Sequence, residues 1–173
     1  MVQIRVEQTE DREAIRSVNE KAFGRSQEAN IVDKLRQFCD GRLSLVAAIE
    51  GHVVGHILFS PVVIESESGV VEGMGLAPLA VLPKYQRQGI GSKLVQEGLR
   101  ILKNSFCPYV IVVGHPDHYP RFGFEAASKY GIRSQWKDVP NEAFMVLILD
   151  RSMIDRVSGV ARYRSEFDEA ISE

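Results

Sequence analysis

This chain of 173 residues has only two cysteines, nearly equal numbers of basic and acidic residues, and no long apolar run. The two cysteines, Cys39 and Cys107, fit no metal-binding spacing, so we expect reduced thiols and a cytoplasmic protein. A formal net charge of -2 without a basic run argues against a nucleic-acid partner. No apolar run approaches the ~18 residues of a membrane span, and the N-terminus lacks a signal-peptide layout, so no membrane partner is expected.

The apolar pattern predicts a domain that mixes helices and strands. A first helix should be capped by Thr9 and closed by Gly24, and a second should run from Ser26 to about Phe38. Glu50-Gly51 predicts a tight hairpin turn. The expected strands are Val2–Glu7, Leu43–Ile49, Val53–Ile64, Val70–Leu82, Tyr109–Val113 and Phe144–Leu149. No element is assigned from Arg151 onward.

The fourth of these strands should be interrupted, because it contains Gly73, Gly75 and Pro78. Proline cannot donate a ladder hydrogen bond, so Pro78 predicts a bulge, a strand edge or a parting of neighbouring strands. The apolar run Tyr109–Val113 is typical of a parallel strand, and the order strand, helix, strand predicts a βαβ crossover. The fold class is therefore α+β, with a mixed, mostly antiparallel sheet flanked by helices.

Leu79–Ser92 is the segment with the strongest functional signal. An apolar strand runs to Pro83, a short polar turn follows, and Gly89 and Gly91 open a stretch with helical spacing. Two glycines let main-chain N–H groups converge, and the helix dipole favours phosphate at that end. The segment lacks both the third glycine of a dinucleotide fingerprint and the Gly-Lys-Ser/Thr ending of a nucleoside-triphosphate loop.

Gln86-x-x-Gly89-x-Gly91, directly after Leu79-Ala-Val-Leu-Pro, resembles the pyrophosphate loop of the GNAT superfamily of N-acetyltransferases. The resemblance covers about Val2–Asp150 and implies the GNAT acyl-CoA N-acyltransferase fold, with acetyl-CoA as co-substrate. No metal is expected, because nothing in the sequence completes a metal site. It implies a GNAT N-acetyltransferase domain over residues 1–150. We expect the C-terminal tail, 151–173, to pack on the same domain. In that fold the strands matching those that end at Leu82 and Val113 splay apart into a slot for the pantetheine arm.

The resemblance also implies a coenzyme site built mainly from main-chain groups. N–H groups from Arg87 to Ser92 would surround the pyrophosphate, and the Leu79 N–H would stabilise charge on the thioester oxygen. The implied coenzyme-binding residues are Leu79, Ala80, Val81, Gln86, Arg87, Gln88, Gly89, Ile90, Gly91 and Ser92.

Tyr119 is the implied catalytic residue. Tyr119-Pro-Arg-Phe-Gly-Phe124 is similar to the family's Phe-Tyr-x-x-x-Gly-Phe element, whose tyrosine lies beside the coenzyme sulfur. Here His118 replaces the phenylalanine, and Pro120 predicts a short or distorted helix. A phenol of reference pKa ~10 can protonate a departing thiolate of reference pKa ~8.5. The alternative is a packed tyrosine whose hydroxyl bonds to the backbone.

The group that deprotonates the acceptor amine is left open. Some family members place a glutamate where this chain has Gly75, and Glu72 on the same strand is expected to face the other way. Three residues after the parallel strand are alternatives, although each is also typical of an ordinary polar loop: His115, Asp117 and His118. The hairpin residues His52 and His56 are expected to be structural.

The expected activity is direct transfer of the acetyl group of acetyl-CoA to a primary amine of a small-molecule or peptide acceptor. A homodimer is left open. A second hypothesis is a catalytically silent CoA-binding or sensing module, which the missing carboxylate at Gly75 favours. A third is a phosphate-binding domain unrelated to coenzyme A.

Overall fold

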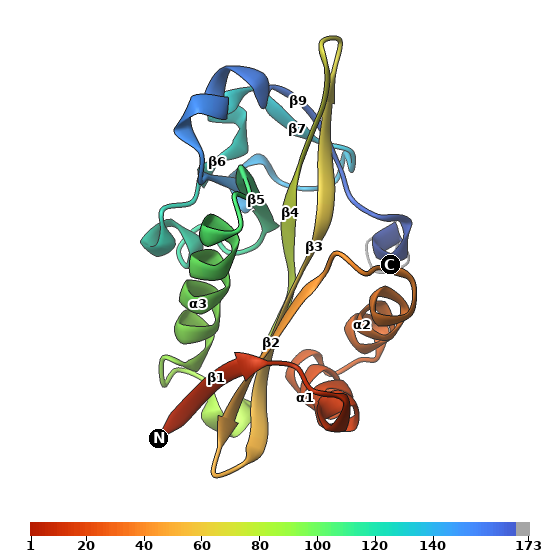
Figure 1. The fold of residues 1–173 in the computed structure, drawn as a ribbon, viewed down its shortest axis with the longest axis vertical. Helices are drawn as coiled ribbons and strands as arrows, with labels where there is room; N and C mark the ends of the chain where they lie inside the picture. The colour runs from red at the N-terminus through yellow and green to blue at the C-terminus, as the bar shows by residue number, and fades with distance from the viewer. Residues whose placement is uncertain (169–173) are drawn as a thin grey trace. The chain divides into compact units, whose positions relative to one another are not determined.

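The structure is a computed structural model that describes residues 1–168 (Figure 1). It divides into two compact units. The first comprises Met1–Ser60, Ala77–Arg100 and the segment from Ser165, and the second comprises Pro61–Leu76 and Ile101–Arg164. Two strands and one helix, β3, β4 and α3, run from one unit into the other.

The described residues form nine strands and three α-helices joined by short 3-10 turns. The strands are β1 (Val2–Val6), β2 (Leu43–Ile49), β3 (His52–Ser66), β4 (Gly69–Val81), β5 (Tyr109–Val113), β6 (Glu125–Ala126), β7 (Ile132–Ser134), β8 (Phe144–Ile148) and β9 (Gly159–Arg162). The helices are α1 (Arg12–Phe23), α2 (Gln27–Phe38) and α3 (Ile90–Asn104).

In the first unit, the alternation of side chains along β3 places helices on both faces of the sheet (Figure 1). Strand β2 pairs antiparallel with both β1 and β3. A Cβ added at Gly55 would lie 3.2 Å from Leu94 of α3. The next residue, His56, points to the opposite face, where Asn19 of α1 contacts its ring. Helix α1 in turn packs on α2.

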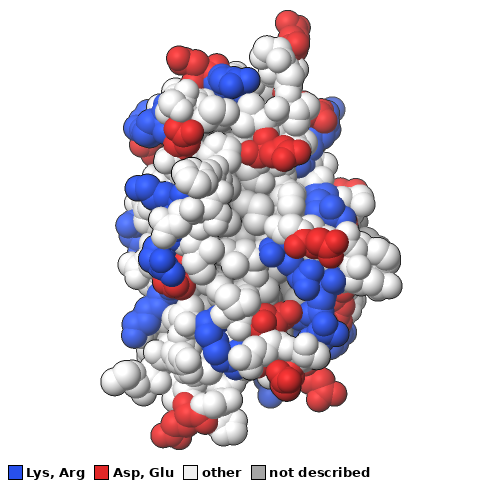
Figure 2. Space-filling view, in the orientation of Figure 1, with Lys and Arg blue, Asp and Glu red and all other residues white. Residues whose placement is uncertain are grey.

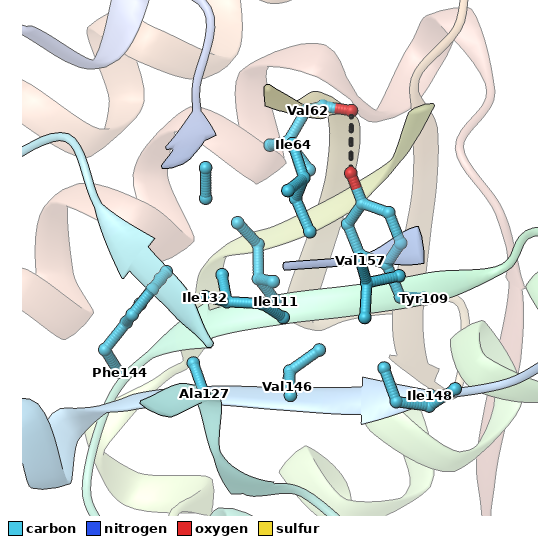
Figure 3. Packing of buried hydrophobic residues seen from close by; sticks show 11 residues of the cluster. Val62, Ile64, Tyr109, Ile111, Ala127, Ile132, Phe144, Val146, Ile148 and Val157 are labelled. Atoms are coloured by element: carbon cyan, nitrogen blue, oxygen red, sulfur yellow. Dashed lines mark hydrogen bonds between the residues drawn. The ribbon is translucent and has the colours of Figure 1, made fainter. Parts of the chain in front are cut away.

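The second unit has its own hydrophobic core, built around β5. Strand β5 pairs parallel with β4 over Met74–Leu76 and antiparallel with β8 over its whole length. Figure 3 shows the buried residues that meet there. They are Val62, Ile64, Tyr109, Ile111, Ala127, Ile132, Phe144, Val146, Ile148, Val157 and Ala161.

The packing of Tyr109 accounts for the glycine at position 73 of β4. Its hydroxyl donates a 2.7 Å hydrogen bond to the Val71 carbonyl and lies 3.4 Å from the Val62 carbonyl (Figure 3). The ring covers Gly73, where an added Cβ would overlap it at 2.5 Å from Cε1. Gly73 is therefore a packing requirement of the second unit's core.

The predicted fold class is confirmed, since the sheet is mixed, mostly antiparallel and flanked by helices. The predicted βαβ crossover is present, because β4 and β5 run parallel and α3 connects them. The Glu50-Gly51 turn is also confirmed, with φ values of 51° and 81° that suit a two-residue hairpin.

Three local predictions were wrong or incomplete. Thr9 does not cap α1, because Thr9–Asp11 forms a 3-10 turn and α1 begins at Arg12. Strand β4 is continuous through its glycines and Pro78, which follows a cis peptide bond, so the predicted interruption is absent. The pairing of β4 with β5 nevertheless ends at Leu76, which agrees with the predicted parting of strands near Pro78. Ser26 does occupy the N-cap of α2, but its side chain makes no capping hydrogen bond.

The segment from Arg151 onward, for which the sequence pattern predicts no element, contains a strand and two 3-10 turns in its described part. Strand β9 pairs antiparallel with the far end of β3 and parallel with β7. Ala161 of β9 is fully buried in the second unit. Farther along, Phe167 is buried in the first unit, in a short turn that contacts α2.

Candidate active site

The turn between β4 and α3 is anchored at the exit of the strand. The Leu82 N–H donates to the Val54 carbonyl of β3 at 2.9 Å, and the Tyr85 N–H donates to the Leu82 carbonyl at 2.8 Å. The chain then passes through the 3-10 turn Pro83–Tyr85 before α3 begins at Ile90. These bonds fix where the helix starts relative to β4.

Two glutamines among the predicted coenzyme residues brace this turn. Gln86 Nε2 donates to the Val81 carbonyl at 2.9 Å, which ties the turn to the last residue of β4. Gln88 Nε2 donates to the Lys84 carbonyl at 3.1 Å. Both side chains thus hold the shape of the main chain around them.

The backbone between the glutamines and the helix adopts left-handed conformations. Arg87 has φ of 62° and Gly89 has φ of 83°. Glycine adopts this conformation without penalty, whereas a residue such as Arg87 does so only where its surroundings impose it. Left-handed residues in a turn make concave groups of N–H donors that are typical of anion sites.

The start of α3 is open and lies against the end of β4. Its first turn has no acidic side chain. The Lys93 N–H donates to the Gly89 carbonyl at 3.1 Å, so the N–H groups of Ile90–Ser92 precede the first bond of the helix. A Cβ at Gly91 would lie 3.9 Å from Leu79 and from Val81. The structure therefore brings the strand and loop halves of the predicted coenzyme site together.

Cationic side chains surround this helix start. Arg87 and Lys93 are exposed, and neither forms an ion pair with any residue in the described part of the chain. Figure 2 shows mostly basic side chains along the flank where Figure 1 draws α3. The helix dipole and these side chains together favour an anion.

Tyr119 belongs to the second unit, where it follows β5. The Gly114 N–H donates to the Ala143 carbonyl at 2.9 Å, and the Tyr119 ring covers Gly114 so closely that a Cβ there would overlap it. The ring also meets Phe124 edge-on, with centroids 5.6 Å apart. Tyr119–Phe122 is a 3-10 helix, which confirms the short or distorted helix predicted from Pro120.

The Tyr119 hydroxyl is not used by the fold. The side chain is 8% exposed, and no residue from 1 to 168 forms a hydrogen bond with the hydroxyl. The backbone-bonded alternative is therefore not what the structure shows. Burial raises the pKa of Tyr119 to about 12, so the phenol is protonated at every ordinary working pH.

Of the three loop residues after β5, His118 lies against Tyr119. Their ring centroids are 4.9 Å apart at an angle of 82°. Burial, and then the nearby Arg121 and His115, lower the pKa of His118 and favour the neutral imidazole. His115 and Asp117 are exposed.

Tyr163 fills the space where a side chain at position 75 would project. A Cβ at Gly75 would lie 2.9 Å from the Tyr163 ring and 2.9 Å from Val62. Glu72 is exposed. No sequence signal pointed to Tyr163, because it approaches β4 only through the distant pairing of β9.

His56 is structural, as predicted, and its tautomer follows from its partners. Ionised Glu7 can only accept, so the Ser44 hydroxyl donates to it at 3.0 Å. The Ser44 oxygen must then accept from His56 Nε2 at 2.9 Å, which leaves Nδ1 to accept from Asn19 Nδ2 at 3.2 Å. Arg36 pairs with Glu7 at 2.7 Å. His56 is thereby held in the core.

Comparison with known proteins assigns the family. The acetyltransferase (GNAT) family profile matches residues 10–124, and the chain belongs to this family of acyltransferases. The chain is similar to the N-acetyltransferase YhbS of Escherichia coli strain K12, with 37% identity over 166 residues, 95% of this chain and 98% of YhbS.

Two similar solved structures contain the coenzyme. The crystal structure of E. coli YhbS in complex with CoA has a TM-score of 0.88 and 36% identity, and the match covers 96% of this chain and 92% of that one. A GNAT family acetyltransferase from Brucella melitensis in complex with acetyl-CoA has a TM-score of 0.80 and 35% identity, and the match covers 97% and 99%.

Two further features concern metal and membrane. Among residues 1–168, no three histidine, cysteine or acidic side chains are arranged to hold a metal ion. No described helix combines the length and apolarity needed to cross a membrane.

Proposed function

We propose that this chain binds acetyl-CoA and transfers its acetyl group directly to a primary amine. The observation that supports this proposal most is the start of α3. The N–H groups of Ile90–Ser92 precede the first hydrogen bond of the helix, Gly89 is left-handed, and the first turn contains no acidic side chain. This combination suits a pyrophosphate. The CoA and acetyl-CoA bound to the two similar proteins support the same ligand here.

The ten coenzyme residues proposed are Leu79, Ala80, Val81, Gln86, Arg87, Gln88, Gly89, Ile90, Gly91 and Ser92. Main-chain N–H groups from Arg87 to Ser92 hold the pyrophosphate, while Gln86 and Gln88 keep the turn in shape. Leu79–Val81 offers main-chain groups to the thioester and the pantetheine. The three-residue register of β4 with β5 ends at Leu76, before this segment begins.

In the proposed reaction the amine nitrogen attacks the thioester carbonyl carbon. A C–N bond forms, and the Leu79 N–H stabilises the negative oxygen of the tetrahedral species. The C–S bond then breaks, the nitrogen loses a proton, and the sulfur leaves as the thiol of coenzyme A. The products are the acetylated amine and coenzyme A.

Tyr119 is the proposed donor to the departing sulfur. Its unbonded hydroxyl supports this role, because a tyrosine used only for packing normally bonds its hydroxyl elsewhere. A pKa of about 12 makes the phenol a weaker acid than free tyrosine. Its contribution is therefore a hydrogen bond that strengthens as charge develops on sulfur, with the proton following as the thiol forms.

His118 is the best-placed proton acceptor among the loop candidates. It contacts Tyr119, and its lowered pKa keeps a lone pair available at neutral pH. A carboxylate at position 75 is ruled out by the identity of the residue and by the ring of Tyr163 that occupies the space. The acceptor is proposed to be a small-molecule or peptide amine.

The coenzyme site is tested with Gly91→Asp. An acidic residue in the first helical turn, in place of glycine, should leave the unliganded protein at least as stable. A carboxylate beside the pyrophosphate should weaken acetyl-CoA binding by about tenfold or more in calorimetry. Gln96→Glu adds the same charge at an exposed position farther along α3 and should bind normally. Unchanged acetyl-CoA affinity in Gly91→Asp would refute the site.

A silent CoA-binding module is the second candidate, and the filled space at Gly75 is the observation that favours it. Acetyl-CoA consumption is to be measured against a panel of polyamines, amino acids, antibiotics and peptide N-termini. Tight acetyl-CoA binding with no turnover across the panel would favour the module. Turnover with any amine would exclude it.

A further inference from the structure

The second unit contains a cavity of about 340 Å³, formed by β7, the start of β8 and the loop between them. Its floor is apolar, because Ile132 and Phe144 line it and both belong to the buried cluster drawn in Figure 3. This volume lies at the small end of the range of organic-ligand sites. The cavity is large enough for a ligand of a few dozen atoms at most.

One wall of the cavity is an indole held in place from behind. Trp136 is the only tryptophan of the chain. Its ring lies against the Tyr163 ring with centroids 4.7 Å apart, and its backbone N–H donates to Ser134 Oγ at 3.0 Å. The Tyr163 N–H donates to Gln135 Oε1 at 2.6 Å, which joins the loop to the segment after β9. These contacts hold the indole in place against the segment after β9.

The rim of the cavity is cationic. Arg133 and Lys137 line it, and neither forms an ion pair with any residue in the described chain. Asp138 and Glu142 are nearby in sequence but are exposed and do not line the cavity. Two cations without acidic partners above an apolar floor favour a ligand that carries negative charge and an apolar body.

We propose that this cavity is a binding site for a small organic anion, with a flat or apolar body against Trp136 and a carboxylate or phosphate between Arg133 and Lys137. The body would cover the indole and the floor, and the head group would take the two cations as partners. None of the residues that line the cavity is a proposed coenzyme residue, so the proposal does not depend on acetyl-CoA binding.

Trp136 reports binding directly, because its fluorescence is the only tryptophan signal of the protein. The full-length protein is titrated with benzoate, phenyl phosphate, benzyl alcohol, benzylamine and inorganic phosphate. At least one of the two aromatic anions should give a saturable change and bind tenfold or more tighter than benzyl alcohol, benzylamine or inorganic phosphate. The tighter of the two anions identifies the head group.

Substitutions at two exposed residues distinguish binding in this cavity from non-specific binding of anions to the protein surface. Arg133→Gln and Lys137→Gln should each weaken the aromatic anion by about fivefold to tenfold. Arg156→Gln removes an exposed arginine of the same unit that does not line the cavity, and it should bind as the unmodified protein does. Equilibrium dialysis with labelled benzoate and phenyl phosphate gives a second readout.

The proposal fails if neither aromatic anion binds by either method, or if benzyl alcohol binds as tightly as the anions. It also fails if both glutamine variants retain full affinity.

Discussion

Tyr109 and Tyr119 are both buried tyrosines, but only the Tyr109 hydroxyl forms a hydrogen bond within the described residues. Burial raises the pKa of both, so both are neutral phenols. The Tyr109 hydroxyl donates to the Val71 carbonyl, whereas the Tyr119 hydroxyl has no partner in residues 1–168. The hydroxyl of Tyr109 therefore serves the fold, and that of Tyr119 is available to a ligand.

Tyr119→Phe should leave stability unchanged within about 0.5 kcal/mol, because no hydrogen bond is lost. Acetyl transfer should fall by about 100-fold, the usual effect of removing a general acid. Thermal unfolding and single-turnover acetyl-CoA consumption check the two parts.

Tyr109→Phe is the matched control for this substitution. It should cost about 1–2 kcal/mol of stability, because the Val71 carbonyl loses its donor, while the acetylation rate of the folded protein is retained. Equal rates for Tyr119→Phe and the unmodified protein would remove Tyr119 from the mechanism.

His56 should make the protein sensitive to mild acid. Burial is the main reason that its pKa is lowered to about 4. The negative charge of Glu7 raises the pKa, and the positive charge of Arg36 lowers it further. The unfolded chain, with a histidine pKa of ~6.5, takes up the proton first as the pH falls. Stability that is complete above pH ~6.5 should therefore decline by about 2–3 kcal/mol by pH ~4.5.

His56→Gln should flatten this part of the pH–stability profile, whatever its effect at neutral pH. His52→Gln, at the exposed start of the same strand, should keep the slope. The range from pH 7 to 4.5 reports on His56 because Glu7 loses its charge only at lower pH. Burial raises the pKa of Glu7, but the hydrogen bonds and charge of Arg36 and the hydrogen bond of Ser44 together lower it by more. Denaturant titrations from pH 7 to 4.5 provide the measurement, and an unaltered slope in His56→Gln would contradict it.

Helix α3 contains two glycines whose surroundings differ. Gly91 has only ordinary contacts at 3.9 Å, whereas a Cβ at Gly98 would overlap the Phe59 ring of β3. Gly91 is thus open toward the end of β4, and Gly98 lets the helix approach the sheet closely.

Gly98→Ala should destabilise the protein by about 1–3 kcal/mol through overpacking, although alanine favours helices. Gly91→Ala should instead be neutral or add up to about 1 kcal/mol. Chemical denaturation of the unliganded variants tests this contrast of sign. Equal effects of the two substitutions would mean that Phe59 moves aside freely.

At the scale of elements, the sequence predicted what local pattern determines. The turn and helix of residues 83–104 were predictable because Pro83, Gly89 and Gly91 act within a few residues. The cap at Thr9 failed because an extra 3-10 turn delays α1, and residue types alone do not distinguish the two starts. Gly73 and Gly75 were expected to interrupt β4, but each makes room for a ring from elsewhere in the chain.

At the scale of the whole molecule, the strands that the sequence did not predict are those that pair with strands far away in the sequence. Strand β9 has four residues and pairs with β3 across most of the sequence. Short strands have little periodicity, and their partners supply most of their stability. The residues proposed for the coenzyme come from one continuous string, so a sequence pattern can propose them, whereas the Trp136 cavity depends on Tyr163 and gives no such local signal.

Phe167 should matter to overall stability more than its place near the C-terminus suggests. It is 5% exposed and buried in the first unit, so Phe167→Ala should cost about 3 kcal/mol or more. Phe106→Ala removes a phenylalanine that is 92% exposed and should change stability by less than about 0.5 kcal/mol. Thermal unfolding compares the two variants, and similar melting temperatures would show that the segment from Ser165 contributes little.

The contact between Gly75 and Tyr163 also limits how this chain can evolve. A single Gly75→Glu change would drive a side chain into an aromatic ring and Val62, and the result would be a poorly folded protein rather than an improved catalyst. A strand carboxylate becomes accessible only after Tyr163 is replaced by something smaller, and that step would remove the support of Trp136. Descendants of this sequence that acquire a base at position 75 should therefore carry a smaller residue at position 163.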